Sequence, residues 1–219
     1  VAETIRERER IAGEIRALGR QAHVLPTDLL DVEAARQMVA DAAQAMGGLH
    51  VLVNNAGGMV DVPGSTGPLT EATPAAFDGM MSLNLRSPLF MAIAAAKLMG
   101  EQGTGGAILN IVSIDAVFPA PTEALYGASK AALVNLTKVL GYEVGKDRVR
   151  VNAIAPGVIE TALTAPRLAT EEQRLDRASF YPIPRAAVPD DVAPPAATPC
   201  PPTPASGSGP VPCATRCPP

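Results

Sequence analysis

Aromatic residues are scarce in this chain of 219 residues: they make up 3% of it, and tryptophan is absent. The core must therefore be built from Ala, Val, Leu and Ile, which belong to the hydrophobic residues that form 47% of the chain. Only two histidines are present, His23 and His50, and no cluster of further ligands accompanies either. We therefore expect no metal site.

Cysteine is nearly confined to the end of the chain, since Cys200, Cys213 and Cys217 all lie within the last twenty residues. The rest of the sequence has no disulfide framework to support its fold. The spacing of the three cysteines matches no common zinc pattern. They have no evident role.

Basic charge is not in excess either, because the formal net charge is −4. Without a basic stripe, nucleic acid is not an expected partner. No apolar run approaches the ~20 residues of a membrane span, and the charged first ten residues do not resemble a secretory signal. We expect a cytoplasmic protein that binds neither nucleic acid nor a membrane.

Helical and strand-like patterns alternate along the chain. This alternation predicts an α/β fold in which a parallel sheet is covered by helices on both faces. The helical patterns cover residues 1–18, 32–46, 73–99 with an interruption near Pro88, and 125–144; the strand patterns cover 22–25, 49–53, 107–112 and 148–154.

Polar and turn-forming residues follow each predicted strand: Asp28, Asn54, Ser113 and the pair Pro156-Gly157. Ligands in open parallel sheets bind at the carboxyl ends of the strands. These residues are therefore candidates for a binding site. Each also has a simpler interpretation, as a turn residue before a helix or after a strand.

The segment Tyr126-Gly-Ala-Ser-Lys130 suggests acid–base chemistry. Residues four apart on a helix lie on the same face, and a nearby ammonium favours phenolate over phenol. We therefore expect the pKa of Tyr126 to fall below its ordinary value of about 10. Ser113 could then help to hold a carbonyl oxygen. Taken alone, this spacing is weak evidence, because an exposed tyrosine beside a solvated lysine is its more common explanation.

Several motifs in order resemble the classical short-chain dehydrogenases/reductases, from about residue 1 to residue 193. The resemblance rests on Asp28-Leu29 after a strand, Asn54-Asn55-Ala56-Gly57, Asn84 in a helix, Ser113 thirteen residues before Tyr126, Lys130, the segment 152–161, and the segment 184–193. It implies a Rossmann-type doubly wound parallel sheet that is incomplete, with the family's first two strands and its last strand missing.

The resemblance also implies catalytic roles. Tyr126 would be the general acid/base, and Lys130 would lower its pKa and bond the nicotinamide ribose. Ser113 would orient the substrate carbonyl. Asn84 would hold a water that links Lys130 to solvent, although a buried asparagine bonded to backbone is the simpler interpretation of that residue. The implied reaction is hydride transfer between NAD or NADP and a small-molecule alcohol or ketone.

Cofactor contacts are implied at both ends of the dinucleotide. The adenine and adenosine side would meet Asp28, Leu29, Asn54, Ala56 and Gly57. The nicotinamide end would meet Tyr126, Lys130, Pro156, Gly157, Ile159 and Thr161. The family's glycine-rich phosphate-binding turn is not found in this sequence, nor is the residue that separates NAD from NADP. We expect the loss of two strands to leave residues 22–25 without their usual partner and to expose an apolar edge at 49–53.

The composition changes after Ala193, where ten of the 22 prolines fall within residues 194–219. We expect a disordered proline-rich tail there, after a partial dinucleotide-binding and catalytic domain at 1–193. The change is typical of translation in a shifted reading frame, a hypothesis that the nucleotide sequence would test. A proline-rich scaffold module is a further, weaker interpretation.

Two functional hypotheses remain. The chain is an NAD(P)-dependent oxidoreductase, or it is a non-catalytic truncated fragment that only associates with intact subunits. In the family, the helices near 84–99 and 125–144 build a homodimer or homotetramer, and we expect the same assembly of the intact protein.

Overall fold

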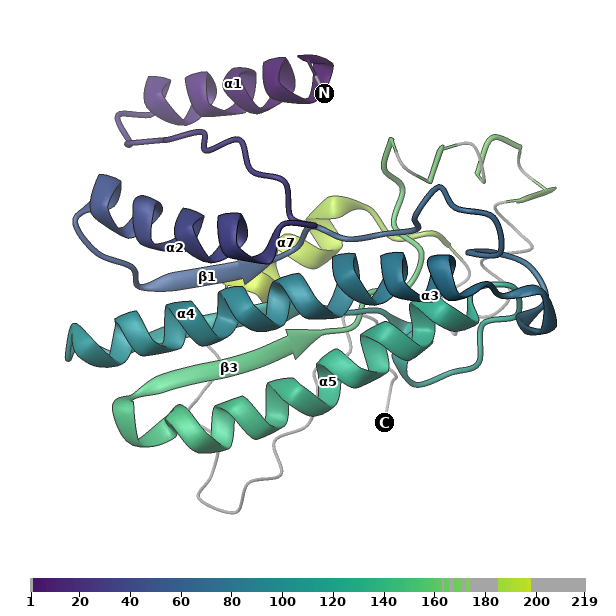
Figure 1. The fold of residues 1–219 in the computed structure, drawn as a ribbon. Helices are drawn as coiled ribbons and strands as arrows, with labels where there is room; N and C mark the ends of the chain where they lie inside the picture. The colour runs from purple at the N-terminus through teal and green to yellow at the C-terminus, as the bar shows by residue number, and fades with distance from the viewer. Residues whose placement is uncertain (1, 163, 166–167, 171, 174–184, 198–219) are drawn as a thin grey trace.

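A three-stranded parallel sheet with the order β1-β2-β3 forms the centre of the molecule. The computed structural model describes residues 2–162, 164–165, 168–170, 172–173 and 185–197, and Figure 1 shows their arrangement. The elements are α1 Ala2–Ala17, α2 Val32–Met46, β1 Val51–Asn54, η1 Leu69–Glu71, α3 Pro74–Met81, η2 Ser82–Arg86, α4 Ser87–Glu101, β2 Gly106–Ile111, η3 Ile114–Ala116, α5 Ala124–Val144, η4 Gly145–Asp147, β3 Val149–Ile154 and α7 Pro189–Ala197.

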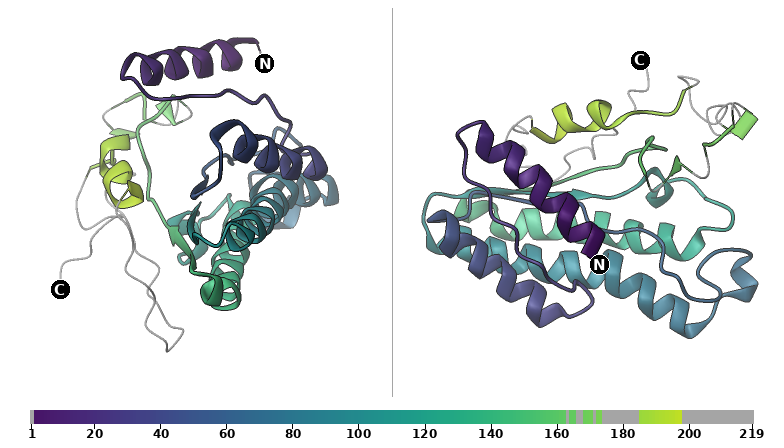
Figure 2. Two further views of the ribbon diagram at one scale, coloured as in Figure 1. Left: turned by 90° about the vertical axis from the view of Figure 1, so that its left-hand side faces the viewer. Right: turned by 90° about the horizontal axis from the view of Figure 1, so that it is seen from above.

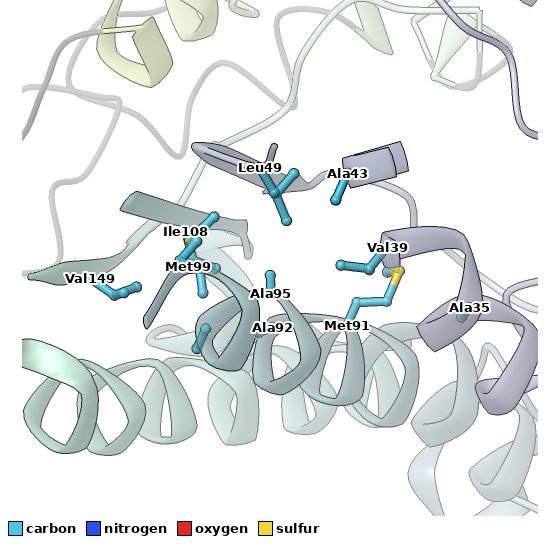
Figure 3. Close-up of a cluster of buried hydrophobic side chains, with 11 residues drawn as sticks. Ala35, Val39, Ala43, Leu49, Met91, Ala92, Ala95, Met99, Ile108 and Val149 are labelled. Atoms are coloured by element: carbon cyan, nitrogen blue, oxygen red, sulfur yellow. The ribbon is translucent and has the colours of Figure 1, made fainter. Parts of the chain in front are cut away.

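Helices α2, α4 and α5 pack against one face of this sheet (Figures 1 and 2). In the register of the sheet, Leu52 pairs with Ile108, and Ile108 with Val151. Neighbours in a parallel ladder point to the same side, so these side chains form one apolar row. They meet the buried residues of α2 and α4 in the main core cluster, where alanines allow the helix backbone to lie close to the strands (Figure 3).

Local capping groups begin and end helices α2 and α3. The Asp31 carboxylate accepts hydrogen bonds from the backbone N–H groups of Glu33 and Ala34 at the start of α2. Gly47 ends that helix in the left-handed region at φ 73°, which suits glycine. The Thr73 hydroxyl accepts from the N–H of Ala76 at the start of α3.

The strand predicted at residues 22–25 does not form, and this prediction is wrong. The structure describes the whole segment 19–28 as loop. A strand needs a neighbour to satisfy its backbone N–H and C=O groups. Within the described part of the chain, β1 pairs only with β2, so its other edge is left open and residues 22–25 have no strand partner.

The second face of the sheet is not fully covered, contrary to the expectation of helices on both faces. Val51 and Val53, which point away from the α4 side, are 59% and 47% exposed. Helix α1 lies apart from the sheet (Figures 1 and 2), and its apolar stripe at Ile11, Ile15 and Leu18 is exposed. The apolar edge expected at 49–53 is therefore present.

The long helical stretch at 73–99 is interrupted before Pro88, by a segment that begins six residues earlier. A π-helical segment at Ser82–Arg86 joins α3 to α4. Pro88 lies in the first turn of α4, where a missing N–H costs little. π-Helical segments often occur at functional sites, and this one contains Asn84.

Helix α7 continues to Ala197, so the first four residues of the predicted tail are helical. The Asp191 carboxylate stabilises the first turn of this helix. It accepts hydrogen bonds from the N–H of Val188 at 2.8 Å and from the Arg185 guanidinium at 2.7 and 2.9 Å. Residues 198–219 lie outside the described residues, and disorder there stays a prediction. None of the described helices has both the length and the hydropathy needed to span a bilayer.

Candidate active site

The carboxyl ends of the three strands meet at one edge of the sheet, as the sequence predicts. The backbone continues the pairing beyond β2, because Val112 N–H donates to the Ile154 carbonyl at 2.8 Å and Ile114 N–H to the Pro156 carbonyl at 3.0 Å. Ser113 is thus held between two fixed residues, close to Pro156. Parallel strands bring these residues together from distant parts of the sequence.

Helix α5 places Tyr126 and Lys130 beside Ser113. Ser113 lies close enough to the Tyr126 phenol to lower its pKa, and the Lys130 ammonium lies 5.6 Å from the centre of the Tyr126 ring. Gly127 allows this approach: a Cβ atom there would lie 2.8 Å from the Asp115 carbonyl oxygen. The structure therefore brings together three of the four predicted catalytic residues.

The pKa of Tyr126 is raised to about 12, so the prediction that it falls is wrong. Burial of the phenol is the largest cause, and the carboxylates of Asp115 and Glu123 add to it, against the opposing hydrogen bond from Ser113. Lys130 is not among the groups that shift this pKa, and its Nζ donates to the Ile111 carbonyl at 3.0 Å.

Burial also lowers the pKa of Lys130 to about 8. The residue is only 3% exposed, and no carboxylate among the described residues forms an ion pair with it. Its bond to the Ile111 carbonyl compensates for part of the lost hydration. A buried cation without a counter-charge, at the ligand edge of a sheet, is a candidate binding group.

Asn84 is fully buried and bonds to backbone, as its simpler interpretation predicts. Its Oδ1 accepts from Gly58 N–H at 2.9 Å, and its Nδ2 donates to the Gly58 carbonyl at 2.8 Å and to the Met80 carbonyl at 3.2 Å. Asn84 therefore holds the loop after β1 against the π-helical segment. Its predicted bond to a water stays a prediction.

Gly57 lies where Asn84 and Lys130 converge. A Cβ atom on this glycine would lie 2.7 Å from Asn84 Oδ1 and 3.2 Å from Lys130 Nζ. The absence of a side chain therefore keeps two buried polar groups accessible from the loop. Ala56, the residue before Gly57 in this loop, is exposed.

The side chain of Asn54 belongs to a buried polar network. Its Nδ2 donates to Asn110 Oδ1 at 2.8 Å and to the Pro88 carbonyl at 3.0 Å, and Asn110 Nδ2 donates to Thr137 Oγ1 at 2.8 Å. Thr137 in turn donates to the Leu133 carbonyl. The network joins β1, β2 and α5. Sequence reasoning missed Asn110 and Thr137, because the pairing of Asn54 with Asn110 depends on the register of β1 and β2.

The loop carrying Asp28 and Leu29 reaches the same edge of the sheet, because the Ser87 hydroxyl at the start of α4 bonds the Leu29 carbonyl. Asp28 Oδ1 accepts from Leu30 N–H at 2.9 Å, the geometry of an ordinary turn. Leu29 packs against the main core cluster.

The segment after β3 forms the remaining part of the site. Ile159 pairs with Ala187, with Glu160 N–H donating to the Ala187 carbonyl at 2.8 Å. Thr161 bonds within its own loop, since its N–H donates to Thr164 Oγ1 at 2.9 Å. An open hollow of about 530 Å³ lies here, lined by Glu160, Thr161, Ala162, Ala165, Leu168 and Ala169. Gly157 is half-buried next to the buried Pro156.

Among the described residues, no three His, Cys, Asp or Glu side chains come together to hold a metal ion. The site instead consists of two hydroxyl groups, an amide, a buried ammonium and a glycine loop. It can donate or accept a proton at the phenol oxygen of Tyr126 and bind hydroxyl groups near Lys130.

Comparisons with known proteins agree with this geometry. The family model described as Enoyl-(Acyl carrier protein) reductase matches residues 1–201. L-rhamnose 1-dehydrogenase (NAD(P)(+)) from Azotobacter vinelandii is 34% identical over 190 residues, which are 84% of this chain and 70% of the relative. A short-chain type dehydrogenase/reductase from Mycobacterium ulcerans is 31% identical, with a TM-score of 0.78, over 84% of this chain and 66% of that one.

A structure of ElxO with NADP bound is also similar, at 31% identity and a TM-score of 0.70, over 77% of this chain and 66% of that one. The matches thus extend over most of this chain and about two thirds of the relatives. The order of motifs, the sheet and these relatives agree, and the chain belongs to the classical short-chain dehydrogenase/reductase family of NAD(P)-dependent oxidoreductases.

Proposed function

We propose that this protein interconverts an alcohol and a ketone with NAD or NADP, using Ser113, Tyr126, Lys130 and Asn84. The observation that carries the proposal is the assembly at the end of β2, where Ser113 lies beside the Tyr126 phenol and the buried Lys130 ammonium lies 5.6 Å from the centre of the Tyr126 ring. Two hydroxyl groups at one point can hold a single substrate oxygen.

Tyr126 exchanges the proton with the substrate oxygen. In carbonyl reduction its phenol oxygen gives up the proton, and in alcohol oxidation it takes the proton back. Because its pKa is about 12, Tyr126 is protonated at neutral pH and thus ready to act as the acid. The nicotinamide, when bound, supplies or accepts the hydride.

Lys130 and Gly57 fit a dinucleotide that carries sugar hydroxyl groups. The Lys130 ammonium is buried and has donors left beyond its bond to the Ile111 carbonyl. The missing side chain of Gly57 gives access to it and to Asn84. We infer that Lys130 binds the ribose and that Asn84 positions the loop above it and holds the predicted water.

The remaining predicted cofactor residues lie along the same edge of the sheet. We infer that Asp28, Leu29, Ala56 and the backbone of Asn54 meet the adenosine, because the Asn54 side chain is occupied in the core network. At the other end, we infer contacts from Pro156, Gly157, Ile159 and Thr161, which border the open hollow after β3.

The assembly of the intact protein follows from exposed apolar groups on two helices. Phe90 on α4 and Val139 and Tyr142 on α5 are exposed, Tyr142 by 82%. We infer that a second copy covers them in a homodimer or homotetramer, and that this assembly works in the cytoplasm.

A second candidate function is that of a non-catalytic fragment that associates with intact subunits. The exposure of Val51 and Val53 favours it, because an uncovered parallel edge offers backbone groups to another chain. Binding of the cofactor separates the two candidates, since the second requires none.

Fluorescence titration of the purified chain with NADPH and NADH tests the proposal, followed by a panel of sugar, small-ketone, steroid and acyl-thioester substrates. We expect binding of one dinucleotide and oxidation or reduction of one substrate class. Tyr126→Phe should abolish turnover and leave cofactor affinity nearly unchanged. The matched control is Tyr142→Phe, an exposed tyrosine of the same helix, which should leave both unchanged. Absence of binding at millimolar concentration would favour the second candidate.

A further inference from the structure

Asp115 contacts the catalytic serine from the turn that follows β2. Ser113 Oγ donates to Asp115 Oδ2 at 3.1 Å, and Asp115 N–H donates back to Ser113 Oγ at 3.2 Å. This pair of bonds forms the start of η3. The carboxylate is therefore hydrogen-bonded to Ser113, and its charge also acts on the Tyr126 phenol.

The direction of these bonds fixes where the hydroxyl hydrogens go. A serine hydroxyl has one hydrogen and two lone pairs. The single hydrogen of Ser113 points to Asp115, and one lone pair accepts the Asp115 N–H. The second lone pair of Ser113 is left to accept a hydrogen from a ligand.

We propose that Asp115 is a positioning residue that takes the hydroxyl hydrogen of Ser113, so that Ser113 meets the substrate oxygen as an acceptor and the site binds the alcohol in preference to the ketone. An alcohol can donate its O–H to the lone pair of Ser113. A ketone oxygen has no hydrogen to give and would face that lone pair, with Tyr126 as its only hydroxyl donor.

The preference for the alcohol rests on the proposed function, but the proton arrangement does not. Three charged groups face the Tyr126 phenol or its ring: Asp115 from η3, Glu123 before α5, and Lys130 from α5 itself. Asp115 is the one of these carboxylates that is bonded to Ser113. Its effect on Tyr126 thus has two parts, its charge and the hydrogen that it withholds.

A double-mutant cycle on Tyr126 ionisation separates the two parts. Tyrosinate absorbance is read within milliseconds of a pH jump in the full chain, and Tyr126→Phe supplies the background of the other tyrosines. Asp115→Ala should lower the Tyr126 midpoint by roughly one pH unit. In a Ser113→Ala background the same change should lower it by less than half as much, because no serine hydrogen is left to release.

The matched control is Glu123→Ala, which removes the same charge without a bond to Ser113. Its smaller shift should be equal in both backgrounds. An Asp115→Ala shift that is also equal in both backgrounds would show an effect of charge alone and overturn the proposal. This measurement needs neither cofactor nor substrate, so it stands whether or not the chain turns over.

A second measurement tests the preference itself once an active alcohol–ketone pair is found. Asp115→Ala should raise the KM of the alcohol and lower that of the ketone, each by several-fold, while Glu123→Ala leaves their ratio unchanged. If the ratio of the two KM values is the same in Asp115→Ala as in the original protein, the proposed preference is wrong.

Discussion

Replacing Lys130 by methionine should stabilise the fold at neutral pH while it removes the ammonium proposed to bind the cofactor. Lys130 is 3% exposed, and burial lowers its pKa from 10.5 to about 8. At pH 7 the folded protein carries the cost of a buried ammonium. With about 1.4 kcal/mol for each pKa unit, that cost is about 3 kcal/mol. Methionine has a similar length and no charge, but it loses the bond to the Ile111 carbonyl, worth about 1 kcal/mol.

The net gain of Lys130→Met is therefore about 2 kcal/mol at pH 7. It should shrink as the pH rises. Between about pH 8 and 10.5 the unfolded lysine binds more protons than the folded one, so the original protein gains stability with pH in this window. Above it the folded lysine is neutral, and the variant should be slightly less stable because only the lost hydrogen bond remains.

Urea unfolding followed by far-ultraviolet circular dichroism at several pH values between 6 and 10 checks this, since the chain has no tryptophan. Lys138→Met is the control, because Lys138 is exposed on the same helix, and its effect should not vary with pH. A Lys130→Met variant that is less stable at pH 7, or whose difference from the original protein is constant with pH, would refute the reasoning. NADPH binding should weaken in Lys130→Met under the proposed function.

Two further substitutions test the packing of the site. Gly57→Ala places a Cβ atom 2.7 Å from Asn84 Oδ1, so NADPH affinity should fall at least ten-fold. The control Gly13→Ala, in open space within α1, should leave affinity unchanged and stabilise the fold by roughly 0.5–1 kcal/mol. Equal affinities for the two variants would contradict the role of Gly57. Thr137→Val leaves Asn110 Nδ2 without its acceptor, so the free energy of unfolding in urea should fall by about 1–3 kcal/mol. Thr137→Ser should restore most of this stability. A Thr137→Val variant as stable as the original protein would show that the network does not support the fold.

Much of the fold could be predicted because its signals are local. Asp31, Thr73 and Gly47 begin or end helices through bonds within a few residues, and each does so in the structure. The alternation of strands and helices predicted a parallel sheet. Its topology alone then placed Ser113 and Pro156 at one edge.

The remaining features depended on neighbours that the sequence does not position. Residues 22–25 have a strand pattern, but a strand forms only against a partner. The π-helical segment at Ser82–Arg86 replaced the break expected at Pro88. The network through Asn110 and Thr137 joins residues 27 positions apart, and Asp115 gained its role only through its contact with Ser113.

The sequence by itself determined which groups the site contains: the order and spacing of Ser113, Tyr126 and Lys130 place them on one strand end and one face of a helix. Tertiary structure decided how these groups behave. The pKa of Tyr126 rises because burial and two carboxylates act on it while Lys130 bonds the Ile111 carbonyl. Hydration and electrostatic interaction depend on which atoms surround a group in space, and spacing along the chain does not specify them.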